Sequence, residues 1–515
     1  MRRQYTGPRR CLLAAGAVLM ALTAGAARAD VAVEQEIVVG TMWEVLPLSM
    51  EARRSRFFNE SEILDTLVKL DYDMTPVPGL ALSWTREDPL TWRFELRPEV
   101  TFHDGTRLTA EVVANSLQHV LEALPYARSL LPIAAMEPEG ELVLRIRTET
   151  PYSPLPNQLT DAFTGIYAPA SFGPDGALVS PIGTGPYRFV SYQSQGDTVT
   201  ERFEGYWGPE PEIDRVTYRY IPDHNTRALA VEAGEVDFAD NLPPAEYARL
   251  TEVEGVQTFA APTAGLYYMV LNTQDGSVLA DPLLRQALNA VIDREAVVEF
   301  ALEGVGIPAP TFFSPAFKTF PQETAHAYDL EGAGALLERA GYASDDGHWT
   351  KDGAPLTLRL HSYSTRTEMP IILEAMASEL QSFGIEVELA LHTWPGMVEV
   401  AEAGDYDGYL VFWTPEMIGH PDLHLTPHLH SAHNLDANGY ANPELDALLE
   451  QGRALEPGAE RDAVYAQALE IVHADAPIIP MVHKVFVAAA SERLQGYRVH
   501  PSAFFYDFKS VTLAE

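Results

Sequence analysis

The stretch TWRFELRPEVTFHDGTRLTAEVV, residues 91–113, decides the fold of this chain. Apolar residues occupy every second position in two short runs, namely Trp92, Phe94 and Leu96, followed by Val100 and Phe102. A period of two is typical of a strand that buries one face and exposes the other. The stretch therefore predicts two strands of one half-buried sheet, joined across Pro98.

His103 and Asp104 come directly after the second run, where they are either a reactive or metal-binding pair or part of a turn. Gly105 readily adopts a positive φ, and an aspartate side chain accepts hydrogen bonds from neighbouring backbone amides. The pair also has too few ligand-type neighbours for a closed metal site. We therefore interpret His103 and Asp104 as turn residues, followed by a helix that Thr109 caps.

Strand-like and helix-like segments alternate along the rest of the chain. Strands are predicted at residues 36–40, 142–147 and 257–261, and helices at residues 283–302 and 371–383, where apolar residues recur at helical spacing. Gly384 predicts the end of the second helix, and residues 385–391 predict another strand. This alternation is typical of an α/β protein. The length of 515 residues predicts two or three domains.

The N-terminus has the pattern of a secretory signal. Basic residues in MRRQYTGPRR precede an apolar run at residues 11–26, which is shorter than the roughly 18–20 residues that span a bilayer. Ala27-Arg28-Ala29 then matches a cleavage site, so we expect a mature protein that begins near Asp30 and is located outside the cytoplasm. Arg9-Arg10 leaves both the twin-arginine route and the general secretion route open.

The composition excludes several classes of function. Cys11 is the only cysteine, so a chain without the signal has no disulfide, zinc–thiolate site or cysteine nucleophile. Residues 1–29 contain five arginines and no acid, which leaves 30 basic against 73 acidic residues after cleavage. A surface of this charge is a poor partner for nucleic acid. The acids are dispersed among apolar residues, and we interpret them as a solvated shell.

Residues 81–121, read as AxSW followed by TWxFxLRxxVxFHDGxxxTAxxVxxS, closely resemble the signature of one known family. This family is the family 5 extracellular solute-binding proteins of ABC importers, which bind oligopeptides, dipeptides and nickel chelates. Further segments are similar to the family in the expected order: PIGTGPY at 181–187, YWG at 206–208, DHNTRALAVEAGEVD at 223–237, LNT, RQALN and DRE within 271–295, residues 328–342, and GYANPELD at 439–446.

The resemblance implies an α/β fold of two hinged lobes with an accessory domain on the N-terminal side. Residues 1–29 are then the signal peptide, 30–66, 176–270 and 480–515 form lobe I, 67–175 form the accessory domain, and 271–479 form lobe II. It further implies a periplasmic, monomeric protein that is not an enzyme and has no cofactor. Its lobes close on a solute, which it then delivers to an ABC permease. The solute is a short peptide or a similar small zwitterion, or alternatively a nickel or other metal chelate.

The candidate binding stretch is VFWTPEMIGHPDLHLTPHLHSAH, residues 411–433. In peptide-binding relatives the matching segment has a Trp or Gly, then an acid, then Asp-Pro, and the acid pairs with the ammonium group of the peptide. Glu416 is the nearest acid after Trp413, and His420-Pro421 stands where Asp-Pro is usual, with an apparent one-residue insertion. The alternatives are a solvated loop acid for Glu416 and core packing for Trp413.

Five histidines lie within this stretch: His420, His424, His428, His430 and His433. Imidazole is a favoured ligand for nickel, copper and zinc. Pro421 and Pro427 disfavour one unbroken helix that would align His420, His424 and His428 on the same face. Three interpretations stay open: a histidine-rich polar loop, one histidine that contacts the solute or its metal, and a complete protein metal site. Nickel-type relatives have a metal-contacting histidine beyond this Trp segment, and its nearest counterpart is His428 or His430.

Arginine could hold a solute carboxylate, because its planar guanidinium donates two parallel hydrogen bonds. Arg366 lies near the position where dipeptide-binding relatives have such an arginine, and Arg128 is the second choice; a surface salt bridge is the alternative for both. The chelator-binding arginine of nickel-type relatives corresponds to Gly165, which disfavours the nickel alternative. Met42 and Trp43 are candidates for the floor of the cleft.

Two other classes of function remain. A secreted hydrolase is disfavoured, because the sequence contains neither a GxSxG nor an HExxH motif and has no cysteine nucleophile. A signalling receptor or chaperone-like module on the same fold would share every motif described above.

Overall fold

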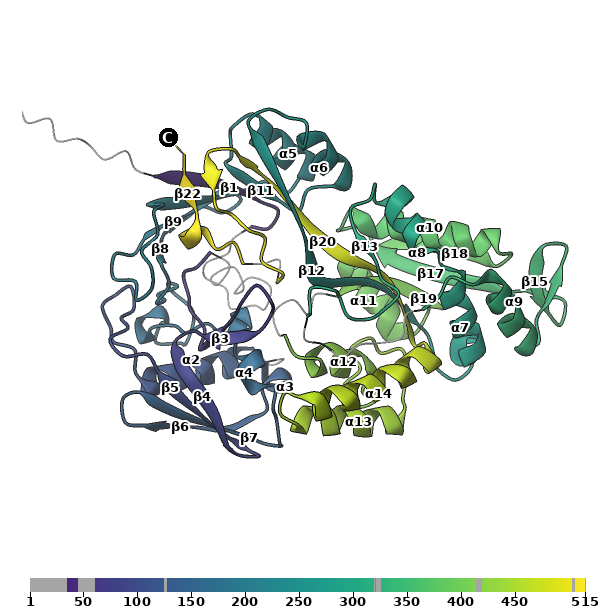
Figure 1. Ribbon diagram of the computed structural model, residues 1–515, viewed down its shortest axis with the longest axis horizontal. Coiled ribbons are helices and arrows are strands. Elements are labelled where there is room, and N and C mark those ends of the chain that lie inside the picture. Colours follow the sequence, from purple (N-terminus) through teal and green to yellow (C-terminus); the bar gives the residue numbers. More distant parts are fainter. Residues whose placement is uncertain are drawn as a thin grey trace, which may run out of the picture. The chain divides into compact units, whose positions relative to one another are not determined.

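The computed structural model describes residues 35–44, 61–124, 127–318, 320, 326–413, 419–502 and 505–514. Within these residues the largest element is an 11-stranded mixed sheet, whose two long strands β12 (Val256–Leu271) and β20 (Ile478–Ser491) pair antiparallel (Figure 1). On one side of this pair follow β11 (Phe238–Asp240), β1 (Glu36–Thr41), β10 (Arg215–Tyr220), β9 (Asp197–Arg202) and β8 (Tyr187–Tyr192). On the other side lie β19 (Gly408–Trp413), β17 (Thr357–Tyr363) and β18 (Glu386–His392), and β13 (Ile307–Pro308) pairs with β20.

The long strands β12 and β20 are covered on both faces. Residues 263–271 of β12 are buried without interruption, and nearly every position of β20 is buried. A continuous apolar run of this kind is typical of a strand in the interior of a sheet, because both faces must be shielded from water. β12 and β20 therefore join the strands on either side into one sheet, and the predicted α/β class is confirmed.

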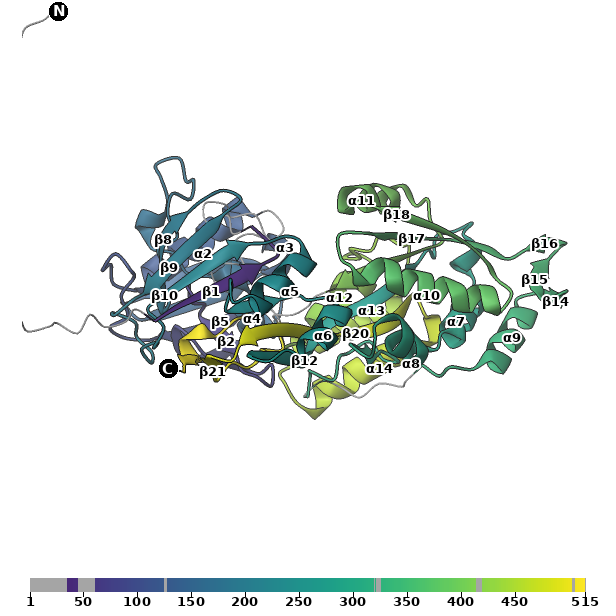
Figure 2. The same cartoon turned by 90° about the horizontal axis from the view of Figure 1, so that it is seen from above.

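Helices pack on the faces of this sheet. α10 (Glu368–Ser382) and α11 (Trp394–Ala403) lie on opposite sides of β17 and β18 (Figure 2), while α5 (His224–Glu232) and α6 (Pro244–Leu250) pack against β20. The other helices of at least eight residues in the described part are α2 (Ala110–Ala123), α7 (Pro282–Val291), α9 (Leu330–Arg339), α12 (Asp422–Leu429), α13 (Pro443–Ala454) and α14 (Ala459–Asp475). No helix in the described ranges is both long enough and apolar enough to cross a membrane.

A smaller sheet of the described part contains the stretch at residues 91–113. Its order is β4 (Ala81–Asp88), β5 (Thr91–Leu96), β7 (Val143–Thr148) and β6 (Ile133–Glu139), and α2 packs against β6 and β7. The first predicted strand is β5, with Trp92 and Phe94 buried. The second predicted strand is wrong. Val100 and Phe102 are buried, but Glu99 has a φ of 61°, and only an isolated bridge joins Thr101 to Arg107.

The turn interpretation of His103 and Asp104 is confirmed. Asp104 Oδ1 accepts a hydrogen bond from the Thr106 amide at 2.9 Å, and Gly105 has a φ of 85°. The Thr109 side chain accepts from the Val112 amide at 3.3 Å and caps α2, as predicted. The imidazole of His103 contributes a structural contact that the sequence did not predict: its Nδ1 accepts from the Gly183 amide at 3.3 Å.

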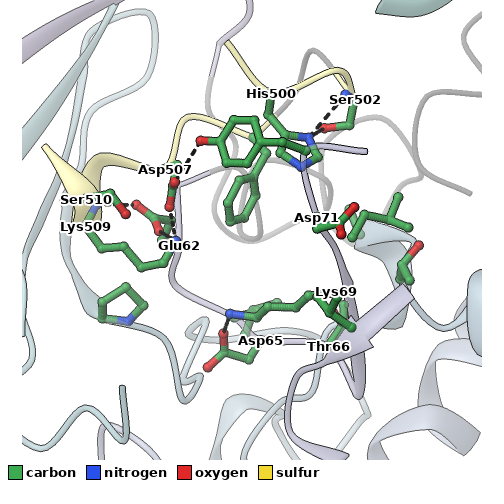
Figure 3. A pocket seen from close by; sticks show the side chains of 18 residues that line it. Glu62, Asp65, Thr66, Lys69, Asp71, His500, Ser502, Asp507, Lys509 and Ser510 are labelled. Atoms are coloured by element: carbon green, nitrogen blue, oxygen red, sulfur yellow. Dashed lines mark hydrogen bonds and ion pairs between the residues drawn. The ribbon is translucent and has the colours of Figure 1, made fainter. Parts of the chain in front are cut away.

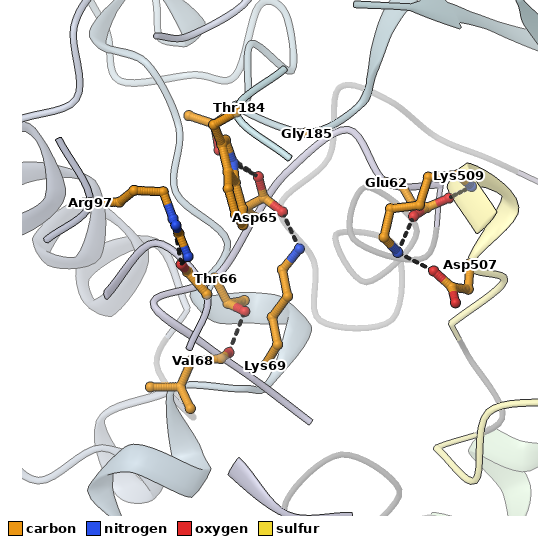
Figure 4. Close-up of polar contacts among 12 residues, drawn as sticks. Glu62, Asp65, Thr66, Val68, Lys69, Arg97, Thr184, Gly185, Asp507 and Lys509 are labelled. Atoms are coloured by element: carbon orange, nitrogen blue, oxygen red, sulfur yellow. Dashed lines mark hydrogen bonds and ion pairs between the residues drawn. The ribbon is translucent and has the colours of Figure 1, made fainter. Parts of the chain in front are cut away.

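Several motifs that are far apart in sequence meet at this point. His103 Nε2 lies 3.0 Å from the Gly185 carbonyl, so the FHDG turn contacts the GTGPY segment. Asp65 Oδ2 accepts from Thr184 Oγ1 at 3.0 Å and from Trp207 Nε1 at 2.8 Å, which adds the YWG segment (Figure 4). These motifs thus meet in one structural cluster around His103 and Asp65.

The prediction of one helix over residues 283–302 is wrong. α7 ends at Val291, Ile292 is extended with a ψ of 113°, and a short helix α8 (Arg294–Ala296) starts after Asp293, whose side chain caps it. The reason is Arg294, which is buried and donates from Nε to the Pro480 carbonyl at 2.7 Å. The prediction of a helix at 371–383 and a strand at 385–391 is confirmed by α10 and β18, with Gly384 at a φ of 93° between them.

His483 on β20 provides a pH-dependent prediction. Its side chain is 1% exposed, and burial, together with the charge of Arg294, lowers the pKa of the imidazole to about 3. Below about pH 6.5 the unfolded chain therefore binds a proton that the folded chain does not, so folding loses about 1.4 kcal/mol per pH unit at this site. When the pH is lowered from 7.5 to 5, we expect the free energy of unfolding to fall by about 2 kcal/mol more in the wild type than in His483→Leu.

Urea unfolding followed by circular dichroism at both pH values measures this difference. His348→Leu is the matched control, because His348 lies at an exposed position on β15 (His348–Lys351). It should show the same pH dependence as the wild type. If His483→Leu also shows that dependence, the buried imidazole does not limit acid stability.

Candidate functional site

The end of β19 carries the first group of predicted site residues. Trp413 is the last residue of β19 and is half-buried, and its ring packs edge-on against the ring of His428 with centroids 4.2 Å apart. His428 lies in α12, which begins after Pro421. Glu416 lies in the segment between β19 and α12, outside the described residues. The structure thus brings Trp413 and His428 together, and the role of Glu416 stays a prediction.

A buried network orients His428. Its Nδ1 lies 3.0 Å from Asp436 Oδ2, and the Tyr268 hydroxyl on β12 donates to Asp436 Oδ1 at 3.1 Å. A carboxylate only accepts, so Nδ1 is the donor in this contact and Nε2 is the ring nitrogen left for another partner. Within the described residues, His428 Nε2 and Trp413 Nε1 are buried polar atoms with no hydrogen-bond partner, and so are the Nε2 atoms of His420, His424 and His430. Such atoms cost roughly 1–3 kcal/mol each, which is a reason to look for a ligand that satisfies them.

The other candidate histidines of this stretch make contacts within the protein. His420 Nδ1 accepts from the Asp422 amide at 3.2 Å, and His430 Nδ1 accepts from the Ala432 amide at 3.1 Å. His424 is surrounded by the rings of three phenylalanines, Phe313, Phe317 and Phe320. Burial lowers the pKa of both His420 and His424 well below the usual value. Among the described residues no group of three or more ligand-type side chains could hold a metal ion.

The two prolines of α12 behave differently. The prediction that no unbroken helix aligns His420, His424 and His428 is confirmed, because α12 begins at Asp422, after His420. Pro427 lies inside α12 and does not end it, since the helix continues to Leu429. A proline removes the one bond from its own nitrogen to the carbonyl four residues earlier. In a helix of eight residues this loss falls in the last turn, where the side chains of His424 and Leu425 are already packed in the core.

Arg366 lies near the end of β19 as well. Its guanidinium carbon is 4.3 Å from the centre of the Phe412 ring, and Lys484 Nζ is 5.2 Å from the same ring. Burial alone would raise the pKa of Glu368, but the charges of Lys484 and Arg366 lower it. In the described ranges no hydrogen bond or ion pair joins the Arg366 guanidinium to another group, so its donors remain available.

The remaining candidates lie elsewhere. Arg128 belongs to α3 (Ala127–Leu130) and donates from Nε to the Leu121 carbonyl at 3.2 Å, so it satisfies the C-terminal turn of α2. Met42 and Trp43 follow β1, where Met42 is half-buried and the Trp43 side chain is 53% exposed. An exposed tryptophan next to the end of a central strand is compatible with a ligand contact, which stays a prediction.

A cavity of about 270 Å³ contains none of the predicted site residues (Figure 3). It is formed by residues around β2 (Val68–Leu70), by Thr160 and Ala162, and by the C-terminal segment from His500 to Ser510. Its volume is close to the lower end of the range for small-molecule sites, roughly 300–1,000 Å³. No sequence pattern predicted this cavity, because its walls come from segments more than 400 residues apart.

The charged side chains of the cavity form two groups (Figure 4). In the first, Lys69 Nζ lies 2.6 Å from Asp65 Oδ1. In the second, Lys509 Nζ contacts Asp507 and lies 2.8 Å from Glu62 Oε1. Burial alone would lower the pKa of Lys509, but the Glu62 and Asp507 carboxylates raise it, so the ammonium stays charged. The second group carries more negative than positive charge.

Comparisons with known proteins agree with this architecture. The family model described as "Bacterial extracellular solute-binding proteins, family 5 Middle" matches residues 75–436. The chain is 28% identical over 456 residues to the glutathione-binding protein GsiB of Escherichia coli O6:K15:H31, covering 85% of this chain and 86% of that protein. Among solved structures, NikA from Brucella suis in complex with Fe(III)-EDTA has a TM-score of 0.84 at 25% identity, covering 93% of this chain and 100% of that one.

A further solved structure, the oligopeptide-binding protein AppA from Bacillus subtilis in complex with a nonapeptide, has a TM-score of 0.75 at 23% identity, covering 94% of this chain and 100% of that one. These likenesses confirm the predicted two-lobed α/β fold of periplasmic binding proteins. The family is a solute-binding type rather than a catalytic one. The match over residues 75–436 shows that the chain belongs to family 5 of the bacterial extracellular solute-binding proteins, the substrate-binding proteins of ABC importers.

Proposed function

We propose that the protein captures a short peptide, or a similar small zwitterionic solute, in the periplasm and delivers it to an ABC permease. It acts as a monomer, without a cofactor and without catalysing a reaction. Its lobes, residues 30–66 with 176–270 and 480–515 and residues 271–479, close on the solute, while residues 67–175 form the accessory domain. Contacts from both lobes to the solute stabilise the closed form that the permease recognises.

The observation that carries this proposal is the available guanidinium of Arg366. A half-buried arginine without a carboxylate partner is costly, since its charge is only partly hydrated. Stacking on Phe412 holds the guanidinium plane and leaves its N–H groups free to bind the carboxylate of a peptide with two parallel bonds. Glu416 is the proposed partner for the ammonium group. The glutathione-binding relatives are consistent with a solute of this class.

A metal chelate is the second candidate, and His428 favours it. Histidines that bind metals usually donate their other ring N–H to a carboxylate, as His428 does to Asp436. NikA, which resembles this chain in fold, was solved with Fe(III)-EDTA. The contact would be made by His428 Nε2 to a metal held by its own chelator, because the described residues provide no complete ligand set.

A thermal-shift screen of the metal-free protein distinguishes the two candidates. A ligand that binds only the folded state raises the melting temperature by mass action. We expect a rise of several degrees with di- to pentapeptides, including glutathione, and no rise with nickel, copper or zinc, alone or with histidine. A rise only with metal plus histidine would replace the peptide proposal with the chelate proposal.

A further inference from the structure

We propose that the cavity beside β2 is a subsite for an α-amino-acid head group, that is, for an ammonium and a carboxylate on the same carbon atom of the solute. Lys69 binds the carboxylate, and for a solute with such a head group Asp71 takes the place of Glu416 as the partner of the ammonium. This inference rests on the proposed function and narrows its solute class. The preferred solutes are free amino acids and peptides in which one residue keeps both its α-ammonium and its α-carboxylate, as a γ-glutamyl residue does. Ordinary α-linked peptides should bind less tightly.

Lys69 has hydrogen-bond donors that the protein does not use. Its ammonium has three N–H groups, and its ion-pair partner within the described residues is Asp65 Oδ1 at 2.6 Å. Asp65 does not need Lys69 for all of its bonds, because Thr184 and Trp207 also donate to it. The Lys69 side chain is 23% exposed and extends along the cavity wall in Figure 3. It is therefore a cation that can bind an incoming carboxylate.

Asp71 has an acceptor that the protein does not use. Its Oδ1 accepts from the amides of Asp73 and Thr75, both at 2.9 Å, and these two bonds fix the side chain. Its Oδ2 has no hydrogen-bond partner in the described part of the chain. A carboxylate that is held in place and half-exposed at a cavity wall is suited to bind an ammonium group.

The two residues line one cavity. Lys69 lies in β2, and Asp71 directly follows the end of that strand, where a turn begins. A head group whose ammonium and carboxylate share one carbon can contact both side chains from one position in the cavity, with a hydrogen bond of about 2.8 Å at each end. The two ends of an ordinary α-linked peptide lie on different residues and cannot fill both positions together.

The electrostatics of the cavity favour a zwitterion over a simple ion. Lys509 is already held between Glu62 and Asp507, and Tyr72 donates to Asp507 at 2.9 Å. A lone anion would leave the Oδ2 acceptor of Asp71 unused, while a lone cation would leave the donors of Lys69 unused. Tyr72 and Phe505 supply aromatic wall beside these charges, so the cavity resembles other small-molecule sites in combining a few polar groups with apolar surface.

The test compares two isomers under reducing conditions. Glutathione carries the head group on its γ-glutamyl residue, whereas α-linked Glu-Cys-Gly has the same atoms without it. We expect the wild type to bind glutathione at least tenfold more tightly in calorimetric titrations. Lys69→Met and Asp71→Asn should each lose roughly tenfold to a hundredfold in affinity for glutathione and lose the preference between isomers, because each removes a charged hydrogen bond.

Two controls keep the test independent of folding. Lys69→Met leaves the buried Asp65 without its cation, so the double variant Asp65→Asn with Lys69→Met removes both charges and keeps the oxygen that Thr184 and Trp207 need. Lys318→Met removes an exposed lysine that pairs with Asp73 on the adjacent turn and should bind as the wild type does. Equal binding of both isomers, or a preference that survives in Lys69→Met, would overturn the head-group subsite and leave the proposed function standing. Failure of every peptide to bind would overturn both.

Discussion

Arg366→Met is expected to weaken peptide binding by roughly a hundredfold, while the melting temperature of the unliganded protein stays within about 1 °C of the wild type. Methionine keeps the apolar contact with the Phe412 ring but cannot form charged hydrogen bonds. The Arg366 guanidinium has no ion-pair partner in the described residues. Its charge helps to lower the pKa of Glu368, but Lys484 Nζ lies 3.9 Å from Glu368 Oε1 and remains beside that carboxylate when Arg366 is removed. The change therefore acts on the solute and not on the fold.

Equilibrium dialysis with a labelled tripeptide measures this effect. Arg188→Met is the matched control, because Arg188 pairs with Glu201 in the β8–β9 ladder and is 49% exposed. It removes a more exposed arginine without touching the proposed site. An Arg366→Met protein that binds the tripeptide as tightly as the wild type would remove Arg366 from the site, and with it the main support for a solute carboxylate at this position.

Gly185→Ala is expected to destabilise the folded state by more than about 3 kcal/mol. A Cβ at this position would lie 1.9 Å from the Glu62 carbonyl oxygen and 2.8 Å from the Ile63 carbonyl carbon. Both obstacles are backbone atoms, so no side-chain movement can relieve the clash. The shift would also disturb the bond between the Gly185 carbonyl and His103.

Gly334→Ala is the control for this prediction, because the nearest atoms to its Cβ belong to Trp349 at 3.5 Å, an ordinary contact. Gly334 lies in α9, where alanine is favoured over glycine by roughly 0.5–1 kcal/mol, so this variant should be as stable as the wild type or more so. Urea unfolding compares the two. Wild-type stability in Gly185→Ala would show that the GTGPY segment can move away from residues 62 and 63.

Local periodicity predicted a large part of the fold. The alternation at Trp92 and Phe94 identified β5, Thr109 identified the start of α2, and Gly384 identified the boundary between α10 and β18. The errors arose where tertiary contacts override local preference. Val100 and Phe102 are buried but do not form a ladder, and Arg294 interrupts the predicted helix by bonding to the carbonyl of Pro480, 186 residues away.

The candidate site was less predictable, for a physical reason. Sequence resemblance selected Trp413 and His428, which the structure places ring against ring, but it gave no indication that Asp436 and Tyr268 hold His428. The cavity was not predicted, since Glu62 and Lys509 are 447 residues apart and no local pattern links them. His424 was a possible ligand by sequence, but it lies among phenylalanine rings, and burial lowers the pKa of its imidazole well below the usual value.

Titration calorimetry of the purified protein with a short peptide, at two temperatures, tests the central claim most directly. We expect saturable binding of one peptide per protein, with a heat that becomes more exothermic at the higher temperature, since closure of the lobes on the solute buries apolar surface and gives a negative heat-capacity change. The absence of binding heat with every peptide in the panel, together with saturable binding of nickel–histidine, would contradict the assignment of this protein to peptide capture.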